Sequence, residues 1–336
     1  LLPFRWICDA QYSLVAKHRT GANLLARADN DNEFDLALSW IKRAADNNDR
    51  NAQYALSQIY LKGDRIEQNI ERGENYLIAA AENGLADAQY DYASREVDKG
   101  SDSAVIAQLI VAAAEQGFER AFAQAGQFLR DGDDIERDLS RAAFFFKQAA
   151  DNGDAQSQLE TARNFDNGIG VPKDREEAIR YYQLSAMQGL VEAEIKLAEA
   201  LNQGDGIKED FKQAFSYYMR AAKKGNAEAA YNLGMMLQAG IGTQVDLRKA
   251  ANWYEIAAKQ GQLESQVNLG LLYVGGENFL QDFERAHMWF NIAAANGRKD
   301  AKELRDRLSF KLTNETIASA QKKARICLES NFSKCD

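Results

Sequence analysis

Residues 166–189, DNGIGVPKDREEAIRYYQLSAMQG, hold the pattern in this chain that is most similar to a ligand site. Gly168 and Gly170 form a Gly-x-Gly pair ahead of a helix, and such turns often cradle phosphates because the first N–H groups of a helix are free. Here Asp174 stands at the N-cap position, where its carboxylate would occupy those N–H groups. The third glycine of a dinucleotide fingerprint is missing, and the pair follows a helix instead of a strand. We therefore interpret the segment as a corner between two helices.

Other residues that could carry chemistry are few. The two histidines, His18 and His287, lie far apart in sequence, and no Cys/His spacing indicates a zinc site. His287 directly follows a repeated alanine, Ala286, so we interpret it as a residue on a helix face. The acidic stretch at 131–138 lacks the glycine and the distal glutamate of a calcium loop. We expect no metal, no cofactor and no enzyme activity.

Composition narrows the class of protein. Among 336 residues, 46% are hydrophobic and 27% are charged, which suits a folded chain, and with two prolines and many alanines we expect an all-α fold. The net charge of −9 argues against nucleic acid or anionic lipid as a partner. Membrane insertion is not expected, because no apolar run approaches the roughly 20 residues that span a bilayer. A first residue other than Met fits a removed signal peptide or a start within a longer chain, and the oligomeric state stays open.

The glycines belong to an internal repeat. The segment AIRYYQLSAMQG at 178–189 has eight copies, and a second pattern, as in AEAAYNLGMMLQAGIG at 227–242, runs between them. Both patterns carry small or apolar residues at the helical period, so each repeat is predicted to be a helix hairpin of about 36 residues. The copies begin at positions 37, 73, 106, 142, 178, 214, 250 and 286, with a spacing of 36 except for one of 33.

Two columns of residues fix the predicted hairpins. The first helix has a column of small residues, where two helix backbones approach closely beside an aromatic pair. An N-cap type stands four residues before each repeated marker position of the second helix, and its side chain accepts from the first-turn N–H groups and stabilises the helix by about 1 kcal/mol. The small column is Ser57, Ala93, Gly126, Ala162, Ala198, Gly234 and Gly270, and the predicted N-caps are Asn69, Asp102, Asp138, Asp174, Asp210, Asp246 and Asp282.

The repeat G-x-G-(V/I)-x-x-D-x-x-x-A-x-x-(W/Y)-Y-x-x-A-A-x-x-G, followed by A-x-x-x-L-G, resembles the Sel1-like repeat, a relative of the tetratricopeptide repeat. The resemblance implies a right-handed α-solenoid of about eight hairpins with capping helices at both ends. We expect an N-terminal capping segment at 1–32, the solenoid at 33–312, and a capping helix with a cysteine-containing tail at 313–336. Departures occur early: Gly73 and Ile106 replace the repeated alanine, and the corner at 99–105 is shortened.

The resemblance also implies a function. Proteins with such repeats mostly act as scaffolds or adaptors, often in the bacterial envelope. We therefore predict a non-enzymatic scaffold that binds a partner protein or peptide along a concave groove, in the periplasm or outside the cell. The alternatives are a protein that binds or hydrolyses cell-wall fragments or polysaccharide, and a cytoplasmic location. The β-lactam binding of a cysteine-rich branch is not carried over, because its cysteine pair in each repeat is absent here.

By analogy with the tetratricopeptide repeat, certain positions of the first helix face the groove. Arg130, Arg163 and Arg120 could form a basic spot for a partner carboxylate, although arginines on helices are usually just solvated. An apolar stretch of Tyr231, Met235, Val267, Leu271 and Val274 could dock a peptide or helix, unless Val267 and Leu271 are buried between repeats. The candidate partner-binding residues are Tyr54, Gln58, Tyr90, Arg120, Gln127, Arg130, Arg163, Glu199, Tyr231, Met235 and Leu271, and the groove positions also include Leu159 and Ile195.

The state of the cysteines indicates whether the protein resides in an oxidising or a reducing cellular compartment. Cys327 and Cys335 stand eight residues apart, which in one continuous helix separates their Cα atoms by about 12 Å, too far for a disulfide. They could bond if the helix ends near 330–331 and the chain folds back. Some envelope members of the family end in a similar pair, so the resemblance favours the bond; two reduced thiols of a cytosolic protein are the alternative. Cys8 is the odd one out.

Overall fold

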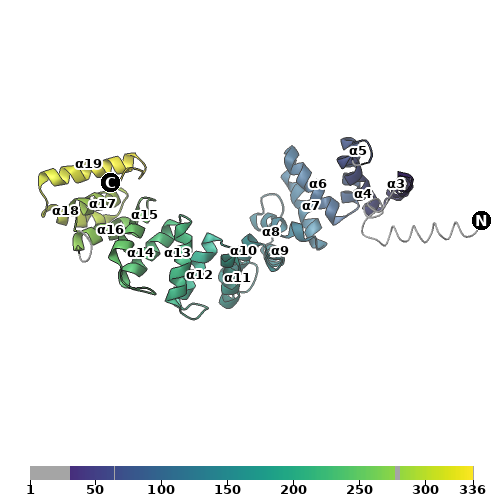
Figure 1. The fold of residues 1–336 in the computed structure, drawn as a ribbon. Coiled ribbons are helices and arrows are strands. Elements are labelled where there is room, and N and C mark those ends of the chain that lie inside the picture. Colours follow the sequence, from purple (N-terminus) through teal and green to yellow (C-terminus); the bar gives the residue numbers. More distant parts are fainter. Residues whose placement is uncertain (1–30, 64, 277–280, 336) are drawn as a thin grey trace, which may run out of the picture. The chain divides into compact units, whose positions relative to one another are not determined.

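The computed structural model describes residues 31–63, 65–276 and 281–335 (Figure 1). Over these residues the chain forms seventeen α-helices, one short 3₁₀ helix and no strand, which confirms the predicted all-α repeat architecture. The predicted N-terminal capping segment lies almost wholly outside the described residues, as do His18 and Cys8. The helices are α3 (Asp31–Asp46), α4 (Arg50–Lys62), α5 (Ile70–Glu82), α6 (Ala86–Lys99), α7 (Ser103–Glu115), η1 (Glu119–Ala121), α8 (Phe122–Asp131), α9 (Leu139–Asp151), α10 (Ala155–Asn167), α11 (Arg175–Met187), α12 (Val191–Gln203), α13 (Phe211–Lys223), α14 (Ala227–Ala239), α15 (Leu247–Ala258), α16 (Leu263–Gly275), α17 (Phe283–Ala295), α18 (Lys299–Ser309) and α19 (Asn314–Glu329).

The second helix of each hairpin begins where the sequence places it. In all seven predicted N-caps, the side chain accepts a hydrogen bond from a backbone N–H of the following turn. Asp174, for example, accepts from the N–H of Glu177 at 3.1 Å, so the first-turn donors that a phosphate would need are engaged. Gly170 has a φ of +71°, and a Cβ there would collide with the carbonyl of Leu139. The Gly-x-Gly segment is therefore a helix corner, as predicted.

The small column of the first helices is buried against the aromatic pair of the second helices. A Cβ added to Gly234 would lie 2.5 Å from the ring of Tyr254, and one added to Gly270 would lie 2.5 Å from the ring of Phe290. Ala162 and Ala198 in the same column are fully buried. The small residues therefore let the helices of one hairpin approach closely, because a larger side chain would displace the packed ring.

The packing divides the chain into two units. Unit 1 comprises the residues up to Ser157 together with Ile169–Pro172, and unit 2 comprises Gln158–Gly168 together with Lys173–Asp336. The boundary falls inside α10. Each unit has its own hydrophobic core: Phe122, Phe145 and Phe146 contribute to that of unit 1, while Tyr254, Trp289 and Phe290 contribute to that of unit 2.

A column of buried glutamine or glutamate side chains, which our sequence reasoning missed, joins successive repeats. In unit 1, the amide of Gln53 donates to the carbonyl of Ala45 at 3.4 Å and accepts from Asn83 of the next repeat at 2.9 Å. In unit 2, Glu194 takes the same place and accepts from Lys224 at 3.0 Å. Each pair satisfies a buried polar atom and fixes one repeat to the next. The column comprises Gln53, Gln89, Gln158, Glu194 and Gln266, all buried.

The C-terminal helix α19 packs on α17 and has the predicted N-cap, Thr313. It ends at Glu329, after which two residues with positive φ, Asn331 and Phe332, turn the chain back. Cys327 and Cys335 then form a disulfide with their Cα atoms 4.5 Å apart. The fold-back that this pairing requires is thus present.

Candidate functional site

A cleft of about 800 Å³ opens on unit 1, where α4, the first turn of α6 and the corner between α7 and η1 meet. We call it the unit 1 cleft. The corner follows the repeat copy that begins at position 106. The cleft is lined by Arg50, Asn51, Tyr54, Ala55, Gln58, Leu85, Ala86, Asp87, Gln116, Gly117, Phe118, Glu119 and Arg120.

One wall of the cleft is fixed by a carboxylate beneath it. The hydroxyl of Tyr54 donates to Asp91 Oδ2 at 2.6 Å, and the amide of Gln58 donates to the same oxygen at 3.4 Å. Burial raises the pKa of Tyr54 well above its ordinary value, and the hydrogen bond to Asp91 raises it further. Tyr54 therefore stays protonated at neutral pH, and it shapes the wall instead of transferring a proton.

The opposite side of the cleft carries an arginine that rests on two aromatic rings. The Arg120 guanidinium lies 4.7 Å from the centroid of the Tyr90 ring and 5.9 Å from that of Phe118. The two rings are themselves in contact, with centroids 5.2 Å apart. Within the described part of the chain, Arg120 has no hydrogen-bonded or ion-paired partner. Because cation–π contact uses the face of the guanidinium, its N–H donors remain available along the edge.

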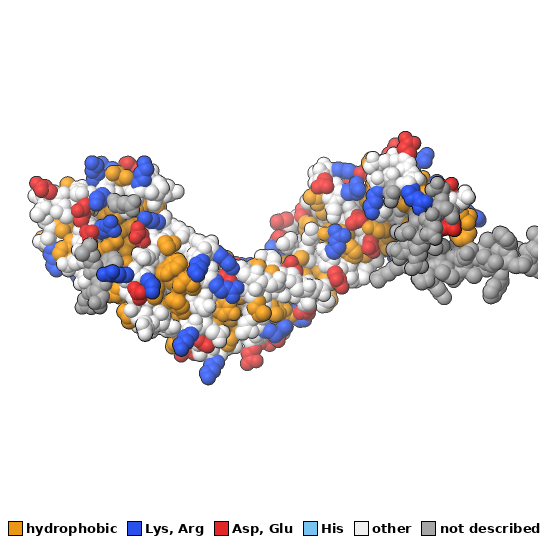
Figure 2. Space-filling model, viewed as in Figure 1, with side chains coloured by type: hydrophobic (Ala, Val, Ile, Leu, Met, Phe, Trp, Pro, Cys, Tyr) orange, Lys and Arg blue, Asp and Glu red, His pale blue; other side chains and the backbone are white. Residues whose placement is uncertain are grey.

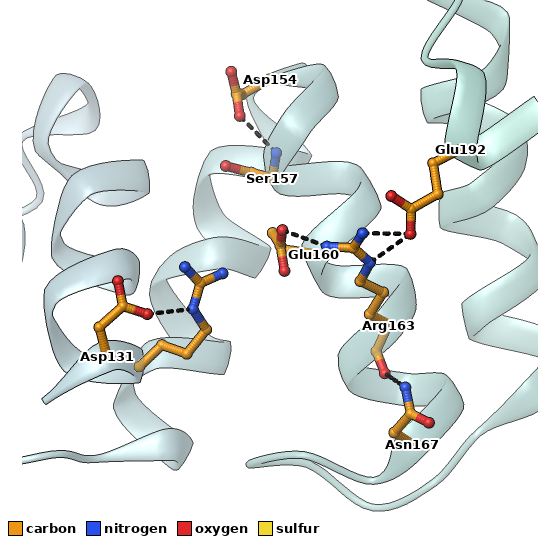
Figure 3. Close-up of polar contacts among 8 residues, drawn as sticks. Asp131, Asp154, Ser157, Glu160, Arg163, Asn167 and Glu192 are labelled. Carbon is orange, nitrogen blue, oxygen red and sulfur yellow. Dashed lines mark hydrogen bonds and ion pairs between the residues drawn. The ribbon is translucent and has the colours of Figure 1, made fainter. Parts of the chain in front are cut away.

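Arg163, in unit 2, has the opposite surroundings (Figure 3). Its guanidinium lies between two carboxylates, donating to Glu160 at 2.8 Å through Nη1 and to Glu192 through both Nε and Nη2. Arg130, in unit 1, donates to Asp131 at 2.8 Å and lies over the Phe146 ring. Acidic side chains thus already engage two of the three arginines of the predicted basic spot.

The structure therefore brings Tyr54, Gln58, Tyr90 and Arg120 together and leaves the other candidates elsewhere. Gln127 is an exposed residue of α8, and Glu199 forms an ion pair with Lys196 on its own helix α12 at 2.9 Å. The remaining groove candidates, Tyr231, Met235 and Leu271, lie on α14 and α16.

The apolar stretch of unit 2 is smaller than predicted. Met235 and Leu271 are exposed, by 37% and 42%, and Tyr231 lies half-buried against Tyr254. Val267 is buried, which rules out a surface role for it, because α16 packs it into the core. The groove positions Leu159 and Ile195 are buried as well.

His287 is buried on the core side of α17. Its Nε2 lies 3.2 Å from Ser309 Oγ, and that hydroxyl donates to the Arg305 carbonyl, so Nε2 must carry the proton and donate. Nδ1 is then a buried acceptor with no hydrogen-bond partner within the described part of the chain. Burial lowers the pKa of His287, and Arg305 lowers it further, whereas Asp306 acts in the opposite direction.

Two further observations concern metal ions and membranes. Across 31–63, 65–276 and 281–335, no three His, Cys, Asp or Glu side chains gather as a metal site would require, and no helix has the length and apolar character to cross a membrane. On the face seen in Figure 2, basic and acidic side chains are interspersed over the described elements. Mixed charge of this kind suits contact with protein more than with nucleic acid.

Comparisons with known proteins agree with this architecture. No curated protein matches the chain. A solved Sel1 repeat protein from Oxalobacter formigenes is 25% identical, with a TM-score of 0.52 over 90% of this chain and 91% of that one. The antigen c5321 of uropathogenic Escherichia coli, with an SLR fold, is 23% identical, with a TM-score of 0.50 over 97% of this chain and 85% of that one.

Matches to the Sel1 repeat extend over most of the chain. They leave residues 86–122, which hold half of the unit 1 cleft, unmatched. The matched segments are 30–49, 50–85, 123–154, 155–190, 191–226, 227–262 and 263–297. The chain therefore belongs to the Sel1 repeat family, whose members generally serve as scaffolds for protein–protein interaction.

Proposed function

We propose that this protein is a non-enzymatic scaffold that binds a partner protein or peptide in the unit 1 cleft. The observation that carries the proposal is the Arg120 guanidinium, which is held on aromatic rings at the edge of an 800 Å³ cleft and has no acidic partner among the described residues. Arginine and aromatic side chains in such settings contribute much of the binding energy of protein interfaces. The general role of the family supports the same function.

Two polar groups at the cleft, the Tyr54 hydroxyl and the Asp91 carboxylate, are engaged with each other, which favours a binding role over proton transfer for them. Asp91 is engaged by Tyr54 and Gln58, and Tyr54 keeps its proton at neutral pH. A hydrolase would need a nucleophile or a base within hydrogen-bond reach of a bound substrate. Turnover of muropeptides or polysaccharide that stays with the homogeneous protein would overturn the proposal.

We place the protein in the periplasm or outside the cell as part of this proposal. The support is the Cys327–Cys335 disulfide, because such bonds persist in oxidising compartments and are rare in the cytosol. Mass mapping of the protein from its native host, with free thiols blocked and no reductant, tests this placement. Two blocked, reduced thiols at these positions would favour the cytoplasm.

Site-specific photo-crosslinking tests the use of the cleft. A crosslinking amino acid replaces Gln58 inside the cleft, and in a matched variant it replaces Lys62, which lies on the same helix but does not line the cleft. We expect a defined adduct in the native host from position 58 and none of that mass from position 62. Equal adducts from both positions, or none from position 58, would contradict the proposal.

A further inference from the structure

We infer that the partner segment in the unit 1 cleft presents a carboxylate to Arg120, with an apolar side chain beside it. The inference rests on the proposed function and adds the chemical class of the partner: a peptide segment with an acidic residue next to an apolar one. Its support is the chemistry of the two sides of the cleft.

The first support is the state of the Arg120 guanidinium. The Tyr90 and Phe118 rings lie against it, which restricts the side chain before any ligand arrives. The donors along its edge form a planar fork that matches the two oxygens of a carboxylate. A preoriented guanidinium loses less side-chain entropy on binding than a mobile one.

The second support is the apolar lining next to this arginine. Leu85, Ala86 and Phe118 line the cleft within the same corner, and Ala55 lines it from α4. An apolar side chain adjacent to the ligand carboxylate would bury surface there, at about 25 cal/mol per Å² removed from water. A bare anion would leave this lining in water, so a peptide fits the cleft better than a small acid does.

The acidic residues at the cleft favour a carboxylate over a phosphate as the group that the partner presents. Asp87 and Glu119 line the same cleft, and Asp91 lies beneath the Tyr54 hydroxyl. A phosphate group with close to two negative charges would meet stronger repulsion from these acids than a carboxylate with one. Arg50 also lines the cleft, with Nη1 2.9 Å from the Gly84 carbonyl oxygen, and its one positive charge offsets only one of these acids.

The test begins with a display library of random dodecapeptides selected on the full chain. Synthetic copies of the selected peptides are then measured by fluorescence anisotropy. Each is compared with a copy whose Asp or Glu is changed to Asn or Gln, and with a copy carrying phosphoserine at that place. The protein variants are Arg120→Gln, Arg120→Lys and, as a charge-matched control, Lys62→Gln. Circular dichroism confirms that each variant keeps its helices.

We expect Arg120→Gln to weaken binding about tenfold or more, and the amide peptide to lose a similar factor. The two losses should not add when they are combined, because both remove the same contact. Arg120→Lys should lose less than Arg120→Gln, and Lys62→Gln should change binding by no more than about twofold.

Failure of the inference and failure of the proposed function look different. Peptides that bind less well after Gln58→Ala but ignore Arg120→Gln and the acid-to-amide change would overturn the inference alone. Stronger binding of the phosphoserine copies would overturn it too. A selection whose peptides are all insensitive to changes in the cleft, or that yields no peptide, would overturn both.

Discussion

Arg120 in unit 1 and Arg163 in unit 2 are both arginines, but their guanidinium groups have opposite kinds of neighbour. Arg120 lies over the rings of Tyr90 and Phe118 and lines a cleft. Arg163, in contrast, donates hydrogen bonds to the carboxylates of Glu160 and Glu192. Both stood out in the sequence as groove candidates. The two arginines therefore differ in their neighbours, which are aromatic rings for Arg120 and carboxylates for Arg163.

The same contrast extends to the two stretches of chain. Arg163 lies among consecutive Sel1 matches that run from residue 155 to residue 262, and the carboxylate of Glu192 in the next repeat binds it. Arg120 lies in the unmatched stretch 86–122, which contributes Ala86, Asp87 and the corner before η1 to the unit 1 cleft. Among the described residues, the arginine with free donors thus lies where the chain departs from the family pattern, and the engaged one lies where it follows it.

The largest effect is expected at Glu194, which joins two regular repeats of unit 2. Glu194→Ala should lower the free energy of unfolding by about 3 kcal/mol, since its buried carboxylate accepts from Arg220 at 2.8 Å and from Lys224. Glu194→Gln should cost much less, because glutamine occupies this column in other repeats, as at Gln158. Chemical denaturation monitored by circular dichroism measures both. Equal losses would show that the charge, and not the column, holds the repeats together.

The disulfide offers the next largest effect, again confined to unit 2. Replacing Cys335 by Ser should destabilise the C-terminal end by about 2.5 kcal/mol, because the small loop is no longer closed in the unfolded chain. Hydrogen exchange should then accelerate in α19, while peptide binding in unit 1 stays unchanged. A change in binding would mean that the cleft depends on the far end of the chain.

Reversing the two arginines tests the comparison directly. Arg120→Glu should abolish most partner binding, by tenfold or about 1.4 kcal/mol at least, with little loss of stability. Arg163→Glu should lower the stability and leave partner binding nearly unchanged, because it would put a third carboxylate beside Glu160 and Glu192. Anisotropy and thermal denaturation of the same two proteins separate the outcomes. If both variants bind alike, the contrast between the arginines is wrong.

The smallest expected effect depends on pH. His287 is buried as the neutral form and its pKa is lowered, so the unfolded chain takes up its proton at a higher pH than the folded one. Stability should therefore be fully present above the ordinary histidine pKa of about 6.5 and decline as the pH falls below it. His287→Gln should flatten that slope between pH 7 and 5. Gln127→Asn, at an exposed residue that does not titrate, is the control and should leave the slope in place.

Much of the fold follows from local sequence signals. The N-caps such as Asp174 and Asp246 act on the next turn of the same helix, so their role does not depend on distant contacts. The glycine column is nearly as direct, since Gly234 and Gly270 recur at a fixed spacing opposite an aromatic pair. The buried column of Gln53, Glu194 and the other members has the same periodicity and could have been found by aligning the repeats.

The candidate site depended on contacts that periodicity does not encode. The tetratricopeptide offset wrongly placed Leu159, Ile195 and Val267 in the groove, because the burial of a helix face depends on how the next repeat is set against it. Glu160 stands three residues before Arg163, so the sequence alone could have indicated an ion pair between them. The ion pair with Glu192, in the following repeat, could not be recognised in this way.

The helices, their caps, the hairpin period and the family could all be predicted from the sequence, because these rest on interactions within one turn or between one hairpin and its copy. The surroundings of the two arginines became visible in the tertiary structure alone: the N–H donors of Arg163 bind two carboxylates, and within the described part of the chain those of Arg120 do not. Hydrogen bonds and ion pairs act over a few ångströms, so the packing of neighbouring repeats sets which side chains come within reach of each arginine.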